Sequence, residues 1–515
     1  MAATNNWSLT SLSELTTPQW VSLVAILFFT YAASRSIYLL YFHPASKFPG
    51  PKLAAVSNVY YAYSWLKGRY PWTVEQLTKE YGDVVRVAPN EIVFSAPQAA
   101  LDIYSPAVKS QETWIKTDLM DFGTGDLGFI WENDPVKRRE VAKKVLPAFS
   151  TKALKAKEPT VQMYINMFVD RMKELGSTSE GINLNQWLNW LAIDMSADLA
   201  YSRQLHHMRD AKSTDFSETL LGTSLYGTVM QLTKRFPLLG PFLSPFAILF
   251  VPPKVIRSVP KFFKMTSEEI QKRIDNRGNT THPDFVDYML PADAPAPTTK
   301  KEKVHVEQVA TQLFVAGFDP VQITLFSCVF FLLKNPDTYK TLVDEIRNTF
   351  EDYNDITPDA LVDLKYLNAV IHETLRVHVT TIAGLPRKSP GATVAGVWVP
   401  KGVVCQISNF AICRNARFFH DPLNFHPERW LPADHPKHDA KFSNDDLKCF
   451  YPFSIGPRSC SGREIAWSQT RLFLAKVLWT FNLDMVRGQD KTFDKDFSVH
   501  VMWYRPEVRV RFNQR

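Results

Sequence analysis

The feature that most constrains this chain is a cysteine loop near its C-terminus, PFSIGPRSCSGR at residues 452–463. The loop carries the pattern F-x-x-G-x-R-x-C-x-G, and a helix is predicted to follow from about Glu464. A metal-bound thiolate needs backbone N–H groups directed at its sulfur, and the N-terminus of a helix supplies them. Glycines let the backbone come close to the sulfur and to a flat cofactor. The loop therefore predicts that Cys460 is the thiolate ligand of a haem iron.

Other residues of the loop have predicted roles at the same site. Phe453 is expected to shield the sulfur from water, Gly456 to permit the close approach of the backbone, and Arg458 to pair with a haem propionate. The alternative is a surface loop with a free thiol, which so many fixed positions disfavour. The remaining cysteines form no CxxC pair and are expected to be packing residues: Cys328, Cys405, Cys413 and Cys449.

A second motif is expected to hold the fold together. Glu373 and Arg376 form an E-x-x-R pair, and residues three apart share one helix face, so the two charges can pair. The motif alone occurs by chance in many helical proteins. It gains weight from HPERW at residues 426–430, where Arg429 can join the pair.

With these motifs, the chain resembles the cytochrome P450 family, most closely its microsomal, fungal-type members, over roughly residues 43–515. The resemblance implies a mainly α fold with minor β sheets and an N-terminal transmembrane helix. It also implies haem b as cofactor, molecular oxygen as co-substrate, and electrons from an NADPH-cytochrome reductase, with cytochrome b5 as an optional second donor.

The resemblance also points to further residues that hold the haem propionates. Arg387, in GLPRKSP, stands where the family has a propionate-binding arginine. In the predicted helix at residues 131–149 the usual propionate arginine falls on Ala142, which is a departure from the family. Arg138 or Lys143 is then expected to take its place.

The segment LFVAGFDPVQITL at residues 313–325 resembles the family's oxygen-activating helix. Ala316, Gly317 and Asp319 match the family pattern, but Pro320 stands where the family has a threonine. Proline has no N–H, so the Ala316 carbonyl loses its helical partner and the helix is expected to kink.

Because the threonine hydroxyl is missing, another group must relay the protons. The relay rests on Asp319, on water or on another hydroxyl. Thr324 lies one turn further along the same face and is a candidate, although a hydroxyl that bonds back to its own helix is the favoured interpretation. A hydroxyl of the substrate is a third route.

Three functions are compatible with these motifs. The first is a monooxygenase that inserts oxygen, and the second is the same haem enzyme running a non-inserting oxidation such as desaturation, ring closure, coupling or rearrangement. The third is a haem-binding protein without turnover, which the intact cysteine loop and Asp319 disfavour.

The resemblance predicts an apolar substrate pocket, which suits a lipophilic ligand such as a terpenoid or polyketide-type secondary metabolite. The residues expected to line it are Trp114, Phe122, Phe314, Phe318, Ile382, Val499 and Met502.

The N-terminal segment WVSLVAILFFTYAASRSIYLLYF, residues 20–42, is long enough to cross a membrane, at about 34 Å as a helix. A cleaved signal peptide would need a basic region before it, but residues 1–19 contain no lysine or arginine. Basic residues follow the segment instead, which predicts a lumenal segment (1–19), a single-pass anchor (20–42), a proline-rich hinge (43–52) and a cytosolic catalytic domain (53–515). The predicted location is the endoplasmic reticulum membrane.

The remaining patterns are less specific. The net charge of +7 is mild, and no basic run with interleaved aromatics predicts nucleic-acid binding. The apolar, proline-rich residues 236–254 are expected to dip into the membrane or to form a buried irregular segment. Helical periodicity covers residues 158–175, 304–334, 337–350, 359–377 and 464–481, and alternating, strand-like runs cover residues 84–94, 392–407 and 498–512.

Overall fold

The computed structural model describes residues 16–105, 113–118, 121, 123–236, 251–381 and 385–515. Helices dominate and the sheets are small, which confirms the predicted fold class. The predicted pocket residues Phe122 and Ile382, and residues 237–250 of the apolar segment 236–254, lie outside the described residues.

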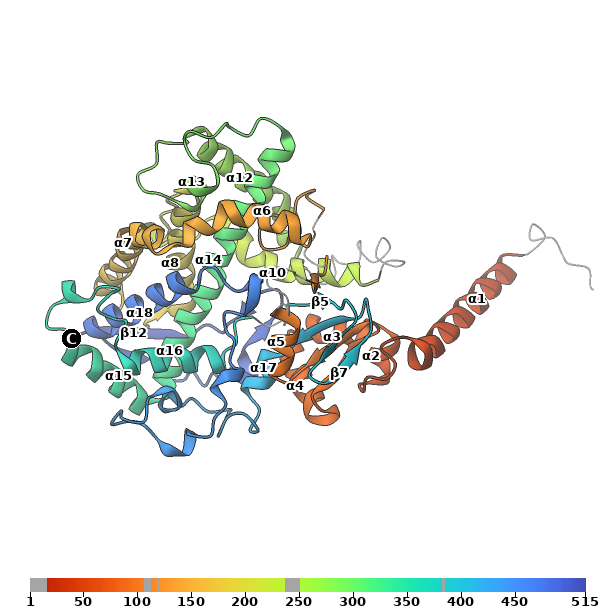
Figure 1. Ribbon diagram of the computed structural model, residues 1–515. Coiled ribbons are helices and arrows are strands. Elements are labelled where there is room, and N and C mark those ends of the chain that lie inside the picture. The colour runs from red at the N-terminus through yellow and green to blue at the C-terminus, as the bar shows by residue number, and fades with distance from the viewer. Residues whose placement is uncertain (1–15, 106–112, 119–120, 122, 237–250, 382–384) are drawn as a thin grey trace, which may run out of the picture.

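The α-helices surround a central helix, α14, that runs through the middle of the molecule (Figure 1). Their bounds are α1 Thr17–Ile37, α2 Lys52–Val56, α3 Val59–Leu66, α4 Tyr70–Tyr81, α5 Gln98–Tyr104, α6 Pro135–Val145, α7 Thr151–Leu175, α8 Leu184–Tyr201, α9 His207–Asp210, α10 Asp215–Lys234, α12 Pro253–Asp275, α13 Phe285–Met289, α14 Lys300–Lys334, α15 Pro336–Thr349, α16 Lys365–Val377, α17 Asn409–Cys413, α18 Arg463–Thr480 and α19 Phe493–Asp496.

The strands form small, separate sheets. One sheet has the order β1-β2-β8-β5-β3, in which β2 and β8 are parallel and the other pairs antiparallel, and another has the antiparallel order β4-β12-β9. Two hairpins pair β6 with β7 and β10 with β11. Their bounds are β1 Val84–Ala88, β2 Glu91–Phe94, β3 Ile115–Lys116, β4 Ile182–Asn183, β5 Arg387–Lys388, β6 Ala392–Val394, β7 Val397–Val399, β8 Val404–Ile407, β9 Phe481–Met485, β10 Ser498–Val499, β11 Trp503–Tyr504 and β12 Arg509–Gln514.

Local sequence signals explain where the main helices begin. Thr299 caps α14 through a capping box with Glu302, and Asp134 caps α6 just before a proline at the first helical position. The periodicity predicted the helical runs that became α7, α14, α15, α16 and α18. The predicted run at 359–377 was too long, because α16 begins only at Lys365 and the residues before it form turns.

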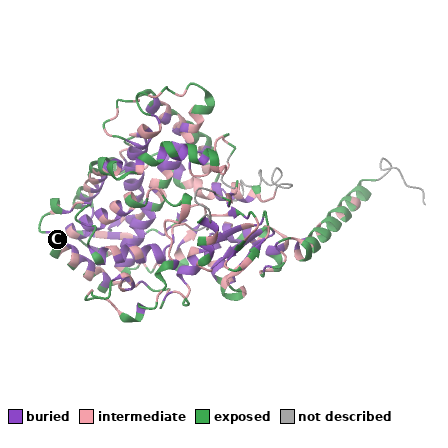
Figure 2. Ribbon diagram, viewed as in Figure 1, coloured by how far each residue is buried: buried purple, intermediate pink, exposed green. Residues whose placement is uncertain are grey.

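Two helices are long and apolar enough to cross a membrane within the described part of the chain, and burial separates them. In the span Thr17–Phe42, which combines α1 with a π-helical turn, only 6% of the residues in an 18-residue apolar window are buried, whereas 72% are buried in the corresponding window of α14. Figure 2 shows α1 exposed along its length and projecting from a molecule whose interior is buried. The N-terminal helix therefore fits a membrane anchor, and α14 is the central helix of the core.

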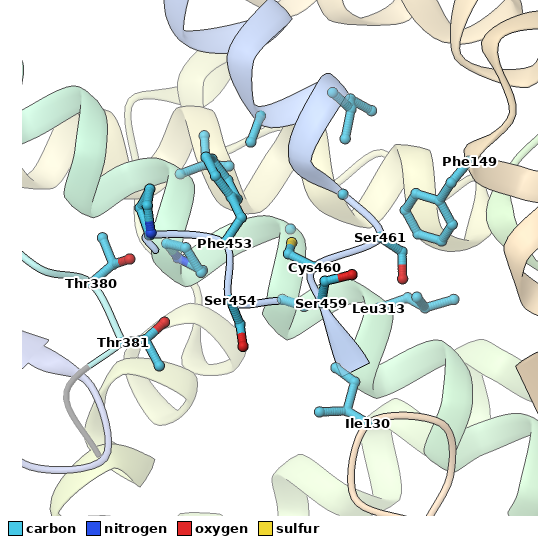
Figure 3. A pocket seen from close by; sticks show the side chains of 18 of the residues that line it. Ile130, Phe149, Leu313, Thr380, Thr381, Phe453, Ser454, Ser459, Cys460 and Ser461 are labelled. Atoms are coloured by element: carbon cyan, nitrogen blue, oxygen red, sulfur yellow. The ribbon is translucent and has the colours of Figure 1, made fainter. Parts of the chain in front are cut away.

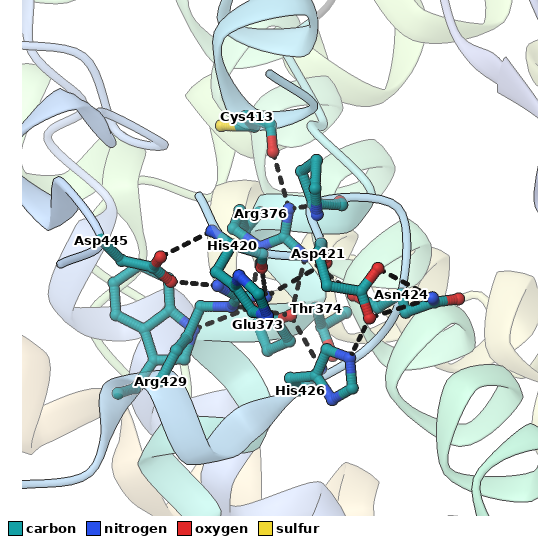
Figure 4. Close-up of polar contacts among 12 residues, drawn as sticks. Glu373, Thr374, Arg376, Cys413, His420, Asp421, Asn424, His426, Arg429 and Asp445 are labelled. Atoms are coloured by element: carbon teal, nitrogen blue, oxygen red, sulfur yellow. Dashed lines mark hydrogen bonds and ion pairs between the residues drawn. The ribbon is translucent and has the colours of Figure 1, made fainter. Parts of the chain in front are cut away.

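The carboxylate of Glu373 on α16 is the centre of a buried ion cluster (Figure 4). Arg376 donates to it through Nε at 2.8 Å and Nη2 at 2.7 Å, and the side chains of both residues are fully buried. Arg429 donates through Nε at 3.2 Å and also pairs with Asp445. Burial alone raises the pKa of Glu373, but the two arginines and the donors around it outweigh burial and hold the pKa below its usual value.

The same cluster joins segments that are distant in the sequence. Arg376 also donates to the backbone carbonyls of Cys413, Pro422 and Asn424, at 2.6, 2.7 and 2.9 Å. Glu373 accepts from the backbone of His426 at 2.8 Å. The motif pair and Arg429 therefore meet as the sequence predicted, and they fix α16 to the loop that precedes the cysteine loop.

Replacing Arg376 by alanine should destabilise the fold by about 3–5 kcal/mol, because it leaves a buried carboxylate without its main partner. The free energy of unfolding and the haem content of the purified protein measure the effect, and haem should fail to bind. Lys365→Ala is the matched control, since Lys365 begins the same helix and is exposed. A soluble Arg376→Ala protein with full haem content and normal stability would contradict the structural role.

Candidate active site

The cysteine loop is shaped by two close backbone approaches. The backbone N–H of Cys460 donates to the Phe453 carbonyl at 2.8 Å, which closes the loop before α18 begins at Arg463. Gly456 has φ +75°, and a Cβ there would lie 1.9 Å from the Tyr104 carbonyl oxygen. Only glycine can therefore seat the loop against the end of α5.

Cys460 differs from the other cysteines in its surroundings. Its side chain is exposed, whereas the other four cysteines are buried, as predicted for packing residues. The exposed surface of Cys460 faces an internal cavity, and burial within the protein raises the pKa of the thiol, while a backbone hydrogen bond from Gly462 and the charge of Arg463 oppose that rise. The N–H group at the start of α18 is thus directed at the sulfur, as the loop pattern predicted.

The cavity of about 320 Å³ lies over this thiol. In Figure 3, Phe149 and Leu313 lie on one side of Cys460, and Thr380 and Thr381 on the other. Much of the wall is apolar, from side chains on several elements: Phe129, Ile130, Phe149, Leu199, Phe285, Leu313, Val321, Ile371, Leu375 and Leu385.

Three cationic side chains also line the cavity. Arg458 donates to the Glu132 carbonyl at 2.6 Å, Arg138 lies over the Phe129 ring at 3.7 Å, and Lys116 donates to the Ile130 carbonyl at 2.6 Å. A thiol at the floor, apolar walls and cations at the edge are the chemistry that a haem requires, because the ring is apolar and its two propionates are anionic. The residues present therefore fit a haem.

The structure distinguishes between Arg138 and Lys143, the two residues predicted to replace the family's propionate arginine in α6. Arg138 lines the cavity, whereas Lys143 is exposed and Ala142 is buried outside the lining. Arg387 lies in a small adjoining pocket that Arg458 and Trp114 also line. Lys116 was not predicted, because a single lysine in a two-residue strand carries no sequence signal.

One face of α14 forms the cavity wall. Ala316, Gly317, Pro320 and Thr324 all line it, and α14 continues as a helix through Pro320. The Thr324 hydroxyl donates to the Pro320 carbonyl at 2.8 Å, which is the helix-bonded arrangement favoured from sequence.

Phe314 and Phe318, which were predicted to line the substrate pocket, do not line this cavity. Both are buried and stack on each other, with ring centroids 6.3 Å apart, on a neighbouring face of α14. The helical period explains their position, because residues 314 and 318 are rotated about 100° from 313 and 317. Val499 is likewise fully buried, and Met502 is only partly buried; neither lines the cavity.

Asp319 lies beside the cavity, not in its lining. Gln322 donates to its carboxylate at 3.1 Å. Burial raises the pKa of Asp319 to about 6, and the charge of Arg505 and the Gln322 hydrogen bond oppose that rise. Asp319 can therefore exchange a proton near neutral pH.

Comparisons with known proteins agree with this geometry. The model of the family described as Cytochrome P450 matches residues 51–512. Cytochrome P450 monooxygenase TwmD of Talaromyces wortmannii is 45% identical over 498 residues, covering 96% of each chain. Cytochrome P450 monooxygenase BOA3 of Botryotinia fuckeliana is 33% identical over 495 residues, again 96% of each chain. Cytochrome P450 monooxygenase poxC of Penicillium oxalicum is 33% identical over 488 residues, 95% of this chain and 93% of the relative.

A family model that spans nearly the whole chain, and relatives that align from end to end with it, leave one assignment: the chain belongs to the cytochrome P450 family of haem-thiolate monooxygenases.

Proposed function

We propose that this protein is a membrane-anchored monooxygenase that oxidises a lipophilic small molecule, a terpenoid or polyketide-type secondary metabolite. The observation that carries the proposal is the single cavity shared by Cys460, the cationic side chains and one face of α14, with mostly apolar walls. Such a cavity binds an apolar ligand against a bound haem. The fungal relatives, all named monooxygenases, agree with an oxidation.

Each lining residue has a role in this proposal. When bound, haem b supplies the activation of molecular oxygen with electrons that come from NADPH through a reductase, with cytochrome b5 as an optional donor. The Cys460 thiolate holds the iron, and Arg458, Arg138, Lys116 and Arg387 hold the propionates.

The proton relay is proposed to depend on Asp319 and on the Ala316 carbonyl, which Pro320 leaves without a helical hydrogen bond. Because Pro320 has no N–H, the Ala316 carbonyl has no helical donor, and Ala316 lines the cavity. That carbonyl can accept a hydrogen bond from water or from a substrate hydroxyl. Asp319, with its raised pKa, can supply the proton that the absent threonine hydroxyl would have relayed.

We further propose that residues 1–19 are lumenal, 20–42 cross the endoplasmic reticulum membrane once, 43–52 form a hinge and 53–515 form the cytosolic catalytic domain. The exposed apolar helix that ends at Phe42 supports this arrangement.

Pro320 favours a second candidate function, a non-inserting oxidation such as desaturation, ring closure, coupling or rearrangement. Growth of the source organism with and without this gene, under heavy-isotope oxygen gas, separates the two. For a monooxygenase, the metabolite lost on deletion should carry one new labelled oxygen. A product that has lost hydrogens or been rearranged without gaining label would replace the insertion proposal with the second one.

Replacing Cys460 by serine should abolish the red-shifted absorption of the reduced carbon monoxide complex, because a hydroxyl does not ligate iron as a thiolate does. Product formation should fall below detection. Cys405→Ala is the matched control, since Cys405 is buried in β8 and does not line the cavity. A normal thiolate spectrum in the serine variant would assign the ligand to another residue.

Replacing Pro320 by threonine should change the coupling of NADPH oxidation to product or the distribution of products, because it restores an N–H and a hydroxyl at the cavity wall. Product profiles and peroxide release measure the change. Pro159→Thr is the matched control, since Pro159 lies inside α7 at an exposed position outside the cavity lining. An unchanged profile in Pro320→Thr would remove Pro320 from the mechanism.

A further inference from the structure

A buried arginine from the C-terminal segment lies against α14. Arg505, just after β11, is 4% exposed. Its Nη1 donates to the Gln322 carbonyl at 3.2 Å, its Nη2 donates to Asn189 Oδ1 of α8 at 2.9 Å, and its guanidinium lies 5.3 Å from the centre of the Phe326 ring. The residue thus bridges α14 and α8 from a third segment.

In the described part of the chain, this buried charge has no direct ion pair. Among the described residues, no carboxylate oxygen lies within 4 Å of Arg505, and its Nε has no hydrogen-bond partner. A buried guanidinium without a carboxylate is costly, and burial accordingly lowers the pKa of Arg505. A buried charge of this kind is destabilising unless a charge of opposite sign lies nearby.

The compensating charge is Asp319. It acts on Arg505 at a distance and raises its pKa, while Arg505 in turn lowers the pKa of Asp319. Gln322 stands between them, because its carbonyl accepts from Arg505 and its Nε2 donates to Asp319 Oδ1 at 3.1 Å. Its buried Oε1 has no partner in the described structure, and neither has Arg505 Nε.

The other described groups that pack around Arg505 and Asp319 carry no competing charge. The group that α8 contributes is the neutral amide of Asn189. The end of α16 contributes His378, whose Nδ1 bonds to the Ser327 hydroxyl. Burial first, and the charge of Arg505 second, hold the pKa of His378 well below its usual value, so that it is neutral. Within the described residues, Arg505 is the charged group that acts on Asp319.

We propose that Arg505 is a positioning residue for proton delivery: together with Gln322 it fixes the position and the ionisation of Asp319 beside the Pro320 turn. The Asp319 carboxyl releases its proton toward the cavity through water and takes one back from water, so that it returns to its starting state. The proposal rests on the proposed relay through Asp319, and it adds that the C-terminal segment controls that relay.

The test is a titration of Asp319 by infrared difference spectroscopy in the haem-loaded full chain without substrate, with Asp319→Asn to identify its carboxyl band. Arg505→Gln should raise the pH of half-protonation by about one unit or more, because it removes the neighbouring positive charge. Arg505→Lys, which keeps the charge, should titrate near the wild-type pH. An Arg505→Gln protein with full haem content that titrates as the wild type does would overturn the proposal.

A second variant keeps the test decisive if Arg505→Gln does not fold. Gln322→Leu removes the hydrogen bond to Asp319 and should also raise its half-protonation pH; an unmoved midpoint overturns the proposal. Peroxide release during NADPH oxidation with reductase gives an independent readout. Its pH profile should shift upward with the infrared midpoint in each variant and lose this shift in the Asp319→Asn background.

These outcomes separate the proposal from the proposed function. A shifted infrared midpoint with an unmoved peroxide profile would overturn the role of Arg505 in proton delivery, whatever product the enzyme makes. Failure of the proposed oxidation appears instead in the isotope experiment, which does not involve Arg505.

Discussion

The fold depends on a carboxylate that could not remain buried alone. Glu373 is fully buried, and it stays ionised because Arg376, Arg429 and backbone N–H groups surround it. The same arginines donate hydrogen bonds to backbone carbonyls in the chain that leads from α17 to the cysteine loop. The ion cluster therefore holds a stretch of chain whose only regular structure, in the described residues, is short helical turns, and this stretch leads to the cysteine loop below the cavity.

The second constraint is the central helix, which serves both the core and the cavity. Gly317 faces the cavity on one side and α8 on the other, where an added Cβ would lie 2.6 Å from the Ser196 hydroxyl oxygen. Ser196 in turn donates to the Phe314 carbonyl at 2.7 Å. The helix is thus held closely from outside at the turn where Pro320 removes an internal hydrogen bond, which explains how α14 continues through the proline.

Local patterns predicted the parts of the site that local chemistry determines. The cysteine loop, the E-x-x-R pair and the long apolar helix each carry their signal within a few residues, and each lies where it was expected. The pocket wall was predicted less well, because which face of α14 meets the cavity depends on packing. Lys116 and Arg505 carry no local signal, and Arg505 reaches partners 183 and 316 positions away.

The long-range contact of Arg505 also bears on how the family site can lose its threonine. A hydroxyl on the cavity wall relays protons within one turn of a helix, and a proline at that place removes it. A carboxyl held beside the wall can do the same work only if its pKa is near neutral, and burial provides this for Asp319 while Arg505 limits the rise. In the proposed relay, the departure at Pro320 and the buried charge at Arg505 are parts of one arrangement, in which protons come from Asp319 beside the cavity wall and Arg505 limits its pKa.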